Sequence, residues 1–240
     1  MTEPTDGVRA LAVDIFGTTV DWWTGVTGQV AEVAAERGVA LDAGEVADAW
    51  RELYLPSMAR VNDAARPWAY LDTLHRESLD ELLVRFGVDG AFDEPSRRRL
   101  VRAWHRLPAW DDVAEGLARL RTRYQVVALS NGGFALLTAM LKAEGLDFDA
   151  IISAQNARAY KPDPRAYREA VELLDLAPDR VLMVACHRWD IDGARRAGLR
   201  TAFVERPREK GPHRTADLAA DTASDVKVGD FVELAAALGC

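Results

Sequence analysis

Five short apolar runs limit what this chain of 240 residues can fold into. Turn-forming residues bound each run, and helical patterns lie between most of them. Such runs are typical of buried parallel strands, because a strand covered on both faces is apolar throughout. The pattern predicts an α/β fold with a doubly wound parallel sheet. The five runs span residues 10–16, 126–130, 150–153, 181–186 and 201–205.

The first two runs are separated by a gap that is too long for one crossover helix. Between about Trp22 and Leu107 there is hardly any strand signal, and four amphipathic stretches occur instead, at residues 26–37, 46–60, 71–86 and 95–106. We expect a helical cap domain of residues 22–107, inserted into a core of residues 1–21 and 108–240. Ligands of such sheets bind beyond the carboxyl ends of the strands, and a lid at that edge excludes water.

Local signals predict several helix ends in the second half of the chain. Pro164 suits the first turn of a helix through Leu174, and Asp163 suits its N-cap. Gly145 and Gly198 are expected to end the helices that precede them.

Composition and charge restrict the partners and the compartment. A net charge of -8 argues against a nucleic-acid partner and against an anionic membrane surface. No stretch approaches the length of an apolar membrane span, and the polar N-terminal residues 1–9 do not resemble a signal peptide. The two cysteines, Cys186 and Cys240, form no disulfide framework, so a reducing cytoplasm is expected.

Asp14 is the first candidate functional residue. It ends the first apolar run and is followed by Gly17, where the chain can turn sharply. A carboxylate at the end of a buried strand is poorly suited to packing and well suited to nucleophilic attack, although it could also cap the next turn. Phe16 stands two residues later, where hydrolysis of a phosphate ester would require an acid.

Five segments, in this order, resemble the haloacid dehalogenase superfamily and, within it, the L-2-haloacid dehalogenase (type II haloacid dehalogenase) branch. The resemblance implies a Rossmann-like core with an inserted helical cap domain. It also implies a cofactor-free hydrolase that converts short 2-haloalkanoic acids, through an aspartyl ester and with inversion, to 2-hydroxy acids and halide. The segments are Asp-Ile-Phe-Gly-Thr from residue 14, Ala-Trp-Arg from 49, Leu-Ser-Asn-Gly from 129, Tyr-Lys-Pro-Asp-Pro from 160 with Tyr167, and Trp-Asp from 189 followed by Gly-Ala from 193.

The resemblance implies five catalytic residues. Asp14 attacks carbon 2 of the haloacid, Thr18 holds the Asp14 carboxylate, and Lys161 keeps that carboxylate ionised. Arg51 receives the departing halide, and Asp190 positions or deprotonates the water that cleaves the ester. Each has a simpler alternative: a turn threonine, a solvated lysine or arginine, or an aspartate that only caps a helix.

The resemblance also implies a substrate pocket. Phe16 and Trp189 would form an apolar wall around the halogen-bearing carbon, although either could belong to the core. Ser130 and Asn131 would donate hydrogen bonds to the substrate carboxylate. Tyr167 lies within reach of the same pocket and could equally be a half-buried core tyrosine.

Two positions depart from the branch pattern. Ala185 and His187 stand where a serine and an asparagine are usual, before Asp190. His187 could replace the asparagine as a donor in the substrate pocket or act as a base, because an imidazole titrates near neutral pH. It could also mark a different substrate, or be a buried core histidine. Cys186 is expected to pack in the strand.

The sequence disfavours a magnesium-dependent phosphatase, which is the commoner activity in the superfamily. Phe16 and Cys186 replace two of the acids that such enzymes use, and Mg²⁺ prefers oxygen ligands in octahedral geometry. No metal and no cofactor is therefore expected. A phosphohydrolase with an atypical site, or a non-catalytic binding protein on this scaffold, remain as alternatives. The expected partners are a small haloacid and halide, and the family tendency suggests a homodimer.

Overall fold

The computed structural model describes residues 5–240. Residues 1–4 lie outside the described residues. They belong to the N-terminal segment that does not resemble a signal peptide and to the predicted core of residues 1–21 and 108–240. Six parallel strands form one sheet in the order β3-β2-β1-β4-β5-β6. Their bounds are β1 (Ala10–Val13), β2 (Gln125–Ser130), β3 (Ala150–Ser153), β4 (Val181–Ala185), β5 (Arg200–Val204) and β6 (Val226–Val228).

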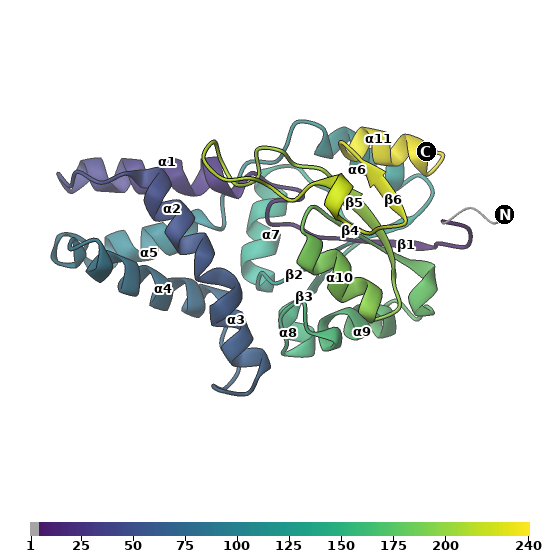
Figure 1. Cartoon of the computed structure of the whole chain (residues 1–240), viewed down its shortest axis with the longest axis horizontal. Helices are drawn as coiled ribbons and strands as arrows, with labels where there is room; N and C mark the ends of the chain where they lie inside the picture. The colour runs from purple at the N-terminus through teal and green to yellow at the C-terminus, as the bar shows by residue number, and fades with distance from the viewer. Residues whose placement is uncertain (1–4) are drawn as a thin grey trace.

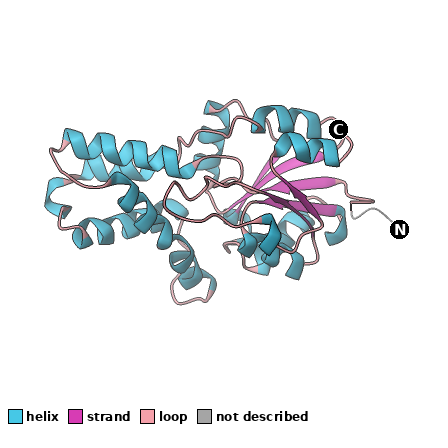
Figure 2. Ribbon diagram, turned by 45° about the horizontal axis from the view of Figure 1, so that its top comes forward, coloured by secondary structure: helices cyan, strands magenta, loops and turns pink. Residues whose placement is uncertain are grey.

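The predicted doubly wound fold is confirmed, because helices cover both faces of the sheet (Figure 2). Alternate strand residues point to opposite faces. Leu11 and Val13 of β1 pack in the cluster that contains α6 (Val113–Leu120), α7 (Phe134–Ala143) and α11 (Phe231–Ala237). Ala12 faces the cluster that contains α9 (Pro164–Leu173) and α10 (Arg188–Arg196). The short helix α8 (Ala154–Ala157) follows β3.

The part of the chain from α1 to α5, which lies between β1 and α6, is helical and extends away from the sheet (Figure 1). The predicted helix at 46–60 is two helices, with a break at Leu53. Pro56 explains the break, because it lacks an N–H group and its ring clashes with the carbonyl four residues earlier. The helices are α1 (Trp22–Glu36), α2 (Ala43–Glu52), α3 (Tyr54–Asn62), α4 (Leu71–Arg85) and α5 (Glu94–Ala103).

Other local predictions agree with the structure. The Asp163 side chain accepts a hydrogen bond from Arg165 N and caps α9. Gly145 and Gly198 adopt φ angles of 64° and 89° just beyond α7 and α10, a left-handed conformation that favours glycine. The sixth strand, β6, was not predicted, since a three-residue edge strand gives little signal. Among the described residues, the structure has no helix with the length and hydropathy needed to cross a membrane.

The turn after β1 places the first candidate residue at the sheet edge. The first strand ends at Val13, earlier than predicted, because the chain folds back through Gly17, whose φ is 90°. The amide groups of Thr19 and Val20 then donate to the carbonyl of Ile15. Asp14 therefore lies just beyond the end of β1, next to the ends of β2 and β4.

Candidate active site

Asp14 is held by a donor on each carboxylate oxygen. The Thr18 hydroxyl donates to Oδ2 at 2.8 Å, and the Lys161 ammonium donates to Oδ1 at 2.8 Å. The amide of Cys186 donates to the Thr18 hydroxyl oxygen at 2.9 Å, so the hydroxyl proton is left for Asp14. Asp14 is only 4% exposed. The predicted contact between Thr18 and Asp14 is present, and a rigid, ionised carboxylate results.

Lys161 joins the two predicted catalytic carboxylates. Its ammonium also donates to Oδ2 of Asp190 at 2.5 Å, and the lysine is buried. Burial disfavours the charged lysine, but Asp14 and Asp190 more than offset this and raise its pKa. Burial likewise opposes ionisation of Asp14, and Lys161 and His187 together hold the pKa of Asp14 well below its usual range. Asp14 is therefore ionised at neutral pH.

Asp190 belongs to the site and does not cap a helix. It is the third residue of α10, whose N-cap is His187, and it is fully buried. The Tyr167 hydroxyl donates to Oδ1 of Asp190 at 2.6 Å. Burial raises the pKa of Asp190, and Lys161 and Tyr167 only partly oppose this. Tyr167 thus contacts the second carboxylate, and its predicted contact with substrate stays a prediction.

Asn131 supports Lys161 from the end of β2. Its amide oxygen accepts from Lys161 N at 2.7 Å, and its amide nitrogen donates to Lys161 O at 3.2 Å. The neighbouring Ser130 hydroxyl accepts from Gly132 N at 3.1 Å. The structure thus gives Asn131 a role on the lysine backbone, and hydrogen bonds from Ser130 and Asn131 to a substrate carboxylate stay a prediction.

Arg51 reaches the site from α2 and is not on a solvated helix face. Its side chain is 10% exposed, and its guanidinium lies over the rings of Tyr54 and Trp22, 4.3 Å and 5.2 Å from their centroids. Its Nη2 lies 3.3 Å from Nε2 of His187. Its Nη1 is buried and has no hydrogen-bond partner among residues 5–240. Arg51 therefore presents an unused, positively charged donor inside the site.

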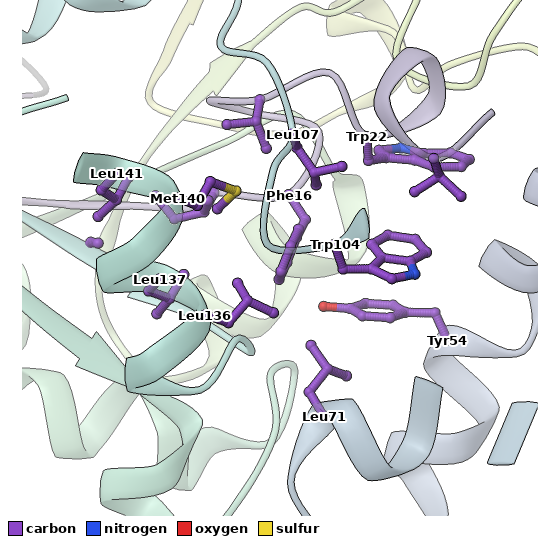
Figure 3. Packing of buried hydrophobic residues seen from close by; sticks show 14 of the residues in the cluster. Phe16, Trp22, Tyr54, Leu71, Trp104, Leu107, Leu136, Leu137, Met140 and Leu141 are labelled. Carbon is purple, nitrogen blue, oxygen red and sulfur yellow. The ribbon is translucent and has the colours of Figure 1, made fainter. Parts of the chain in front are cut away.

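Phe16 lies among other aromatic side chains, with Trp104 and Tyr54 next to it (Figure 3). Phe16 is 2% exposed and meets Tyr54 and Trp104 edge-on, with centroids 6.4 Å and 6.1 Å apart. Trp189 is half-buried and stacks on His187 with centroids 5.2 Å apart. Phe16 thus occupies an apolar environment in which an ionised acid would be poorly solvated.

A buried carboxylate that the sequence did not reveal completes the cluster. Residues 208–215 are mostly polar, which is typical of a surface loop, yet Glu209 is 2% exposed. It accepts a hydrogen bond from the Trp22 indole at 2.5 Å and lies 3.1 Å from Nε2 of His187. The one available signal was position, since the loop follows β5 at the ligand-binding edge of the sheet.

A cavity of about 440 Å³ adjoins this cluster. A larger cavity of about 590 Å³ lies elsewhere, beside Trp23 and Trp110, and none of the predicted site residues lines it. Among residues 5–240, no three His, Cys, Asp or Glu side chains are placed to share a metal ion. The smaller cavity is lined by Arg51, Glu52, Tyr54, Leu55, Pro56, His187, Trp189, Glu209, Lys210, Arg214 and Asp217.

Three comparisons relate this chain to known proteins. Residues 8–198 match the family model described as haloacid dehalogenase-like hydrolase. The chain is 32% identical to (S)-2-haloacid dehalogenase 4A of Burkholderia cepacia over 84% of each protein. It matches the crystal structure of a defluorinating L-2-haloacid dehalogenase with a TM-score of 0.94 and 42% identity, covering 100% of this chain and 99% of that one.

A third relative carries a bound acid. It is the L-2-haloacid dehalogenase of Xanthobacter autotrophicus with chloropropionic acid covalently bound, which matches with a TM-score of 0.80 and 26% identity over 96% of this chain and 98% of that one. The matched family model spans most of the sequence and includes Asp14, Arg51, Lys161 and Asp190. This chain belongs to the haloacid dehalogenase-like hydrolase family.

Proposed function

We propose that this protein hydrolyses 2-haloalkanoic acids to 2-hydroxy acids and halide through an ester on Asp14. One observation carries the proposal: the ionised Asp14 carboxylate lies against Lys161 at 2.8 Å, and Phe16 stands where a phosphatase would place an acid. A halide leaves as an anion and needs no proton, so the absence of an acid at Phe16 is no obstacle.

In the first step, an Asp14 oxygen bonds to carbon 2, and the carbon–halogen bond breaks with its electron pair leaving on the halide. Attack from the side opposite the halogen inverts carbon 2. Arg51 supplies the positive charge for the departing halide, through the guanidinium whose Nη1 has no partner among the described residues. Phe16 and Trp189 surround the reacting carbon.

In the second step, water adds to the Asp14 carboxyl carbon and gives a proton to Asp190. The raised pKa of Asp190 suits a base, since it lies nearer to neutrality than that of an ordinary aspartate. The tetrahedral intermediate then collapses, and the departing alkoxide takes the proton back and leaves as the 2-hydroxy acid. Asp14 releases one proton to solvent, so a haloacid and water give hydroxy acid, halide and a proton.

The similar proteins support this chemistry. The relatives at 32% and 42% identity are named as 2-haloacid dehalogenases, and the Xanthobacter autotrophicus enzyme is described with chloropropionic acid covalently bound. The relative at 42% identity is described as defluorinating, so fluorinated acids belong among the substrates to be tried.

We extend the proposal to the organisation of the protein. Residues 22–107 act as a cap domain over a core of residues 1–21 and 108–240, because α2 brings Arg51 to the ends of the strands. The unpaired Cys186 and Cys240 support a cytoplasmic location. A homodimer follows the family tendency, and light scattering on the purified protein tests it.

Halide release from short 2-haloacids tests the function. We expect chloride from L-2-chloropropionate and chloroacetate with no effect of a chelator, and fluoroacetate is tested in parallel for fluoride. No halide from any short haloacid would contradict the proposal. Chelator-sensitive turnover of a general phosphate ester would instead support a phosphohydrolase.

A single turnover in H₂¹⁸O tests the intermediate. Because water attacks the carboxyl carbon, the label is expected first in Asp14 and not in the product. Label that enters the product directly would contradict a covalent ester. Asp14→Asn is the matched variant, and an unchanged halide rate in this variant would indicate that the scaffold does not use Asp14.

A further inference from the structure

Glu209 is buried beside the side chains of His187 and Arg51. Its Oε1 lies 3.1 Å from Nε2 of His187 and 3.7 Å from Nη2 of Arg51. Burial opposes ionisation of this carboxyl, but His187 and Arg51 favour it and the pKa of Glu209 falls to about 2. Glu209 is therefore a fixed negative charge beside His187 and Arg51.

The imidazole of His187 has a carboxylate beside each ring nitrogen. Nδ1 lies 3.4 Å from Oδ2 of Asp14, and Nε2 lies 3.1 Å from Oε1 of Glu209. A neutral imidazole carries one N–H group and would leave the other nitrogen's lone pair facing a carboxylate. An imidazolium has a donor for each carboxylate. The two carboxylates therefore favour the doubly protonated ring and oppose the effect of the Arg51 guanidinium, whose Nη2 lies 3.3 Å from Nε2.

The negative charge that stabilises the His187 imidazolium comes from the two carboxylates and not from the Cys186 thiol. Burial disfavours the imidazolium, whereas Cys186, Glu209 and Asp14 raise the pKa of His187. Burial also raises the pKa of the Cys186 thiol, so the thiol is uncharged near neutral pH and the two carboxylates provide the stabilising charge. The titratable and charged groups that face the ring are Asp14, Arg51, Cys186, Glu209 and, farther off, Asp217.

The loop that carries Glu209 is anchored to the turn after β1. The Arg206 guanidinium donates to Thr18 O at 2.9 Å and pairs with Asp112 at 2.7 Å. Gly17 leaves the space that Glu209 fills, since a Cβ atom there would lie 2.7 Å from Oε1 of Glu209. The carboxylate is thus held in place on the nucleophile's own turn.

We propose that Glu209 is a positioning residue for ester hydrolysis: it holds His187 as an imidazolium whose Nδ1 lies 3.4 Å from Oδ2 of Asp14. This role rests on the proposed function. With Oδ1 bonded to carbon 2, Oδ2 is the carbonyl oxygen, and it takes the electron pair of the C=O bond when water adds. Thr18 and the imidazolium of His187 then stabilise that oxyanion, and the pair returns when the Cγ–Oδ1 bond breaks.

Glu209→Gln tests this role, because it removes the charge and keeps the size. In single-turnover experiments we expect ester hydrolysis to slow roughly ten- to one-hundred-fold, so that the Asp14 adduct accumulates and is seen by peptide mass spectrometry. The rate in the variant should fall as pH rises through the ordinary imidazole range near about 6.5, while the wild-type rate holds to higher pH. A wild-type pH profile in Glu209→Gln would overturn the proposal.

A double-mutant cycle separates this role from a structural one. If Glu209 acts through His187, Glu209→Gln should change the hydrolysis rate only a few-fold in a His187→Asn background. Asp112→Asn is the control for loop anchoring, and it should keep the wild-type pH dependence. Equal effects of Glu209→Gln with and without His187 would overturn the proposal.

Ring titration of His187 by NMR needs no substrate and completes the test. The His187 signal, assigned by its loss in His187→Asn, should titrate at lower pH in Glu209→Gln than in the wild type. An unchanged titration would overturn this role alone. Absence of halide release by the wild-type protein would overturn the proposed function and this role together.

Discussion

The Tyr167 hydroxyl donates a 2.6 Å hydrogen bond to Oδ1 of Asp190, at the opposite end of this carboxylate from Lys161. Both residues are buried, so the bond is shielded from water. Tyr167 comes from α9 and Asp190 from α10, and the close packing of these helices at Gly193 allows the contact. Tyr167 therefore helps to set the charge state of the residue proposed to activate water.

Tyr167→Phe should shift the acid limb of the hydrolysis rate to higher pH. The hydroxyl lowers the pKa of Asp190, so its removal raises a pKa that burial has already raised. Asp190 must be ionised to accept a proton. When pH is lowered, the variant should therefore lose activity at a higher pH than the wild type does. Single-turnover rates between pH 4 and 8 measure the shift, roughly one unit or less by analogy with other hydrogen-bonded carboxylates. An acid limb identical to that of the wild type would argue against Asp190 as the base.

Arg51→Lys should slow halide release by roughly 10²-fold, and Arg51→Met by more. Lysine keeps the charge, but it loses the planar group that lies over Tyr54 and Trp22 and the second set of donors. Rapid-mixing measurement of chloride in the first turnover isolates this step. Arg60→Met, on the exposed side of α3, is the matched control. A loss of less than three-fold in Arg51→Lys would show that the halide leaves elsewhere.

Phe16→Asp should destabilise the protein without creating a phosphatase. The side chain lies between Tyr54 and Trp104 and is 2% exposed, so a carboxylate there would be buried without a partner. We expect a loss of about 3 kcal/mol or more in the free energy of unfolding, measured with urea. Phe16→Leu, which keeps the position apolar, should lose much less. A stable Phe16→Asp variant with magnesium-dependent phosphatase activity would contradict this prediction.

His75 should make the protein less stable in acid. The ring stacks on Trp104 with centroids 4.4 Å apart, and neither ring nitrogen has a hydrogen-bond partner among residues 5–240. Burial lowers its pKa to about 3, so between this value and the unfolded pKa near 6.5 only the unfolded chain takes up a proton. The contribution of neutral His75 to the free energy of unfolding is fully present above about pH 6.5. It decreases as pH drops, by at most about 5 kcal/mol at pH 3.

His75→Phe tests this dependence, because phenylalanine keeps the stacking and cannot be protonated. Urea unfolding at pH 7 and pH 5 should show a smaller difference in the variant than in the wild type. The Trp50 indole donates to the backbone carbonyl of residue 75, so this hydrogen bond survives the substitution. Equal pH dependence of the two proteins would mean that other groups cause the acid sensitivity.

Local sequence patterns predicted the fold, and the resemblance to the haloacid dehalogenases pointed to the candidate site residues. The apolar runs predicted five of the six strands, because strands buried on both faces carry their signal along their whole length. Asp14, Lys161 and Asp190 follow or lie near the ends of such strands, and the parallel sheet brings those ends to one edge. The prediction of one continuous helix over residues 46–60 is wrong, because Pro56 breaks it at Leu53.

The sequence by itself determined the sheet, the helical insertion and the residue types available for catalysis, since these follow from periodicity and from the order of motifs. Only the tertiary structure decided which charged side chains lie next to one another. Glu209 lies 192 residues after Gly17, yet its carboxylate fills the space above that glycine and reaches His187 and Arg51. Such a contact depends on how a loop returns across the sheet edge, and no local propensity records that path.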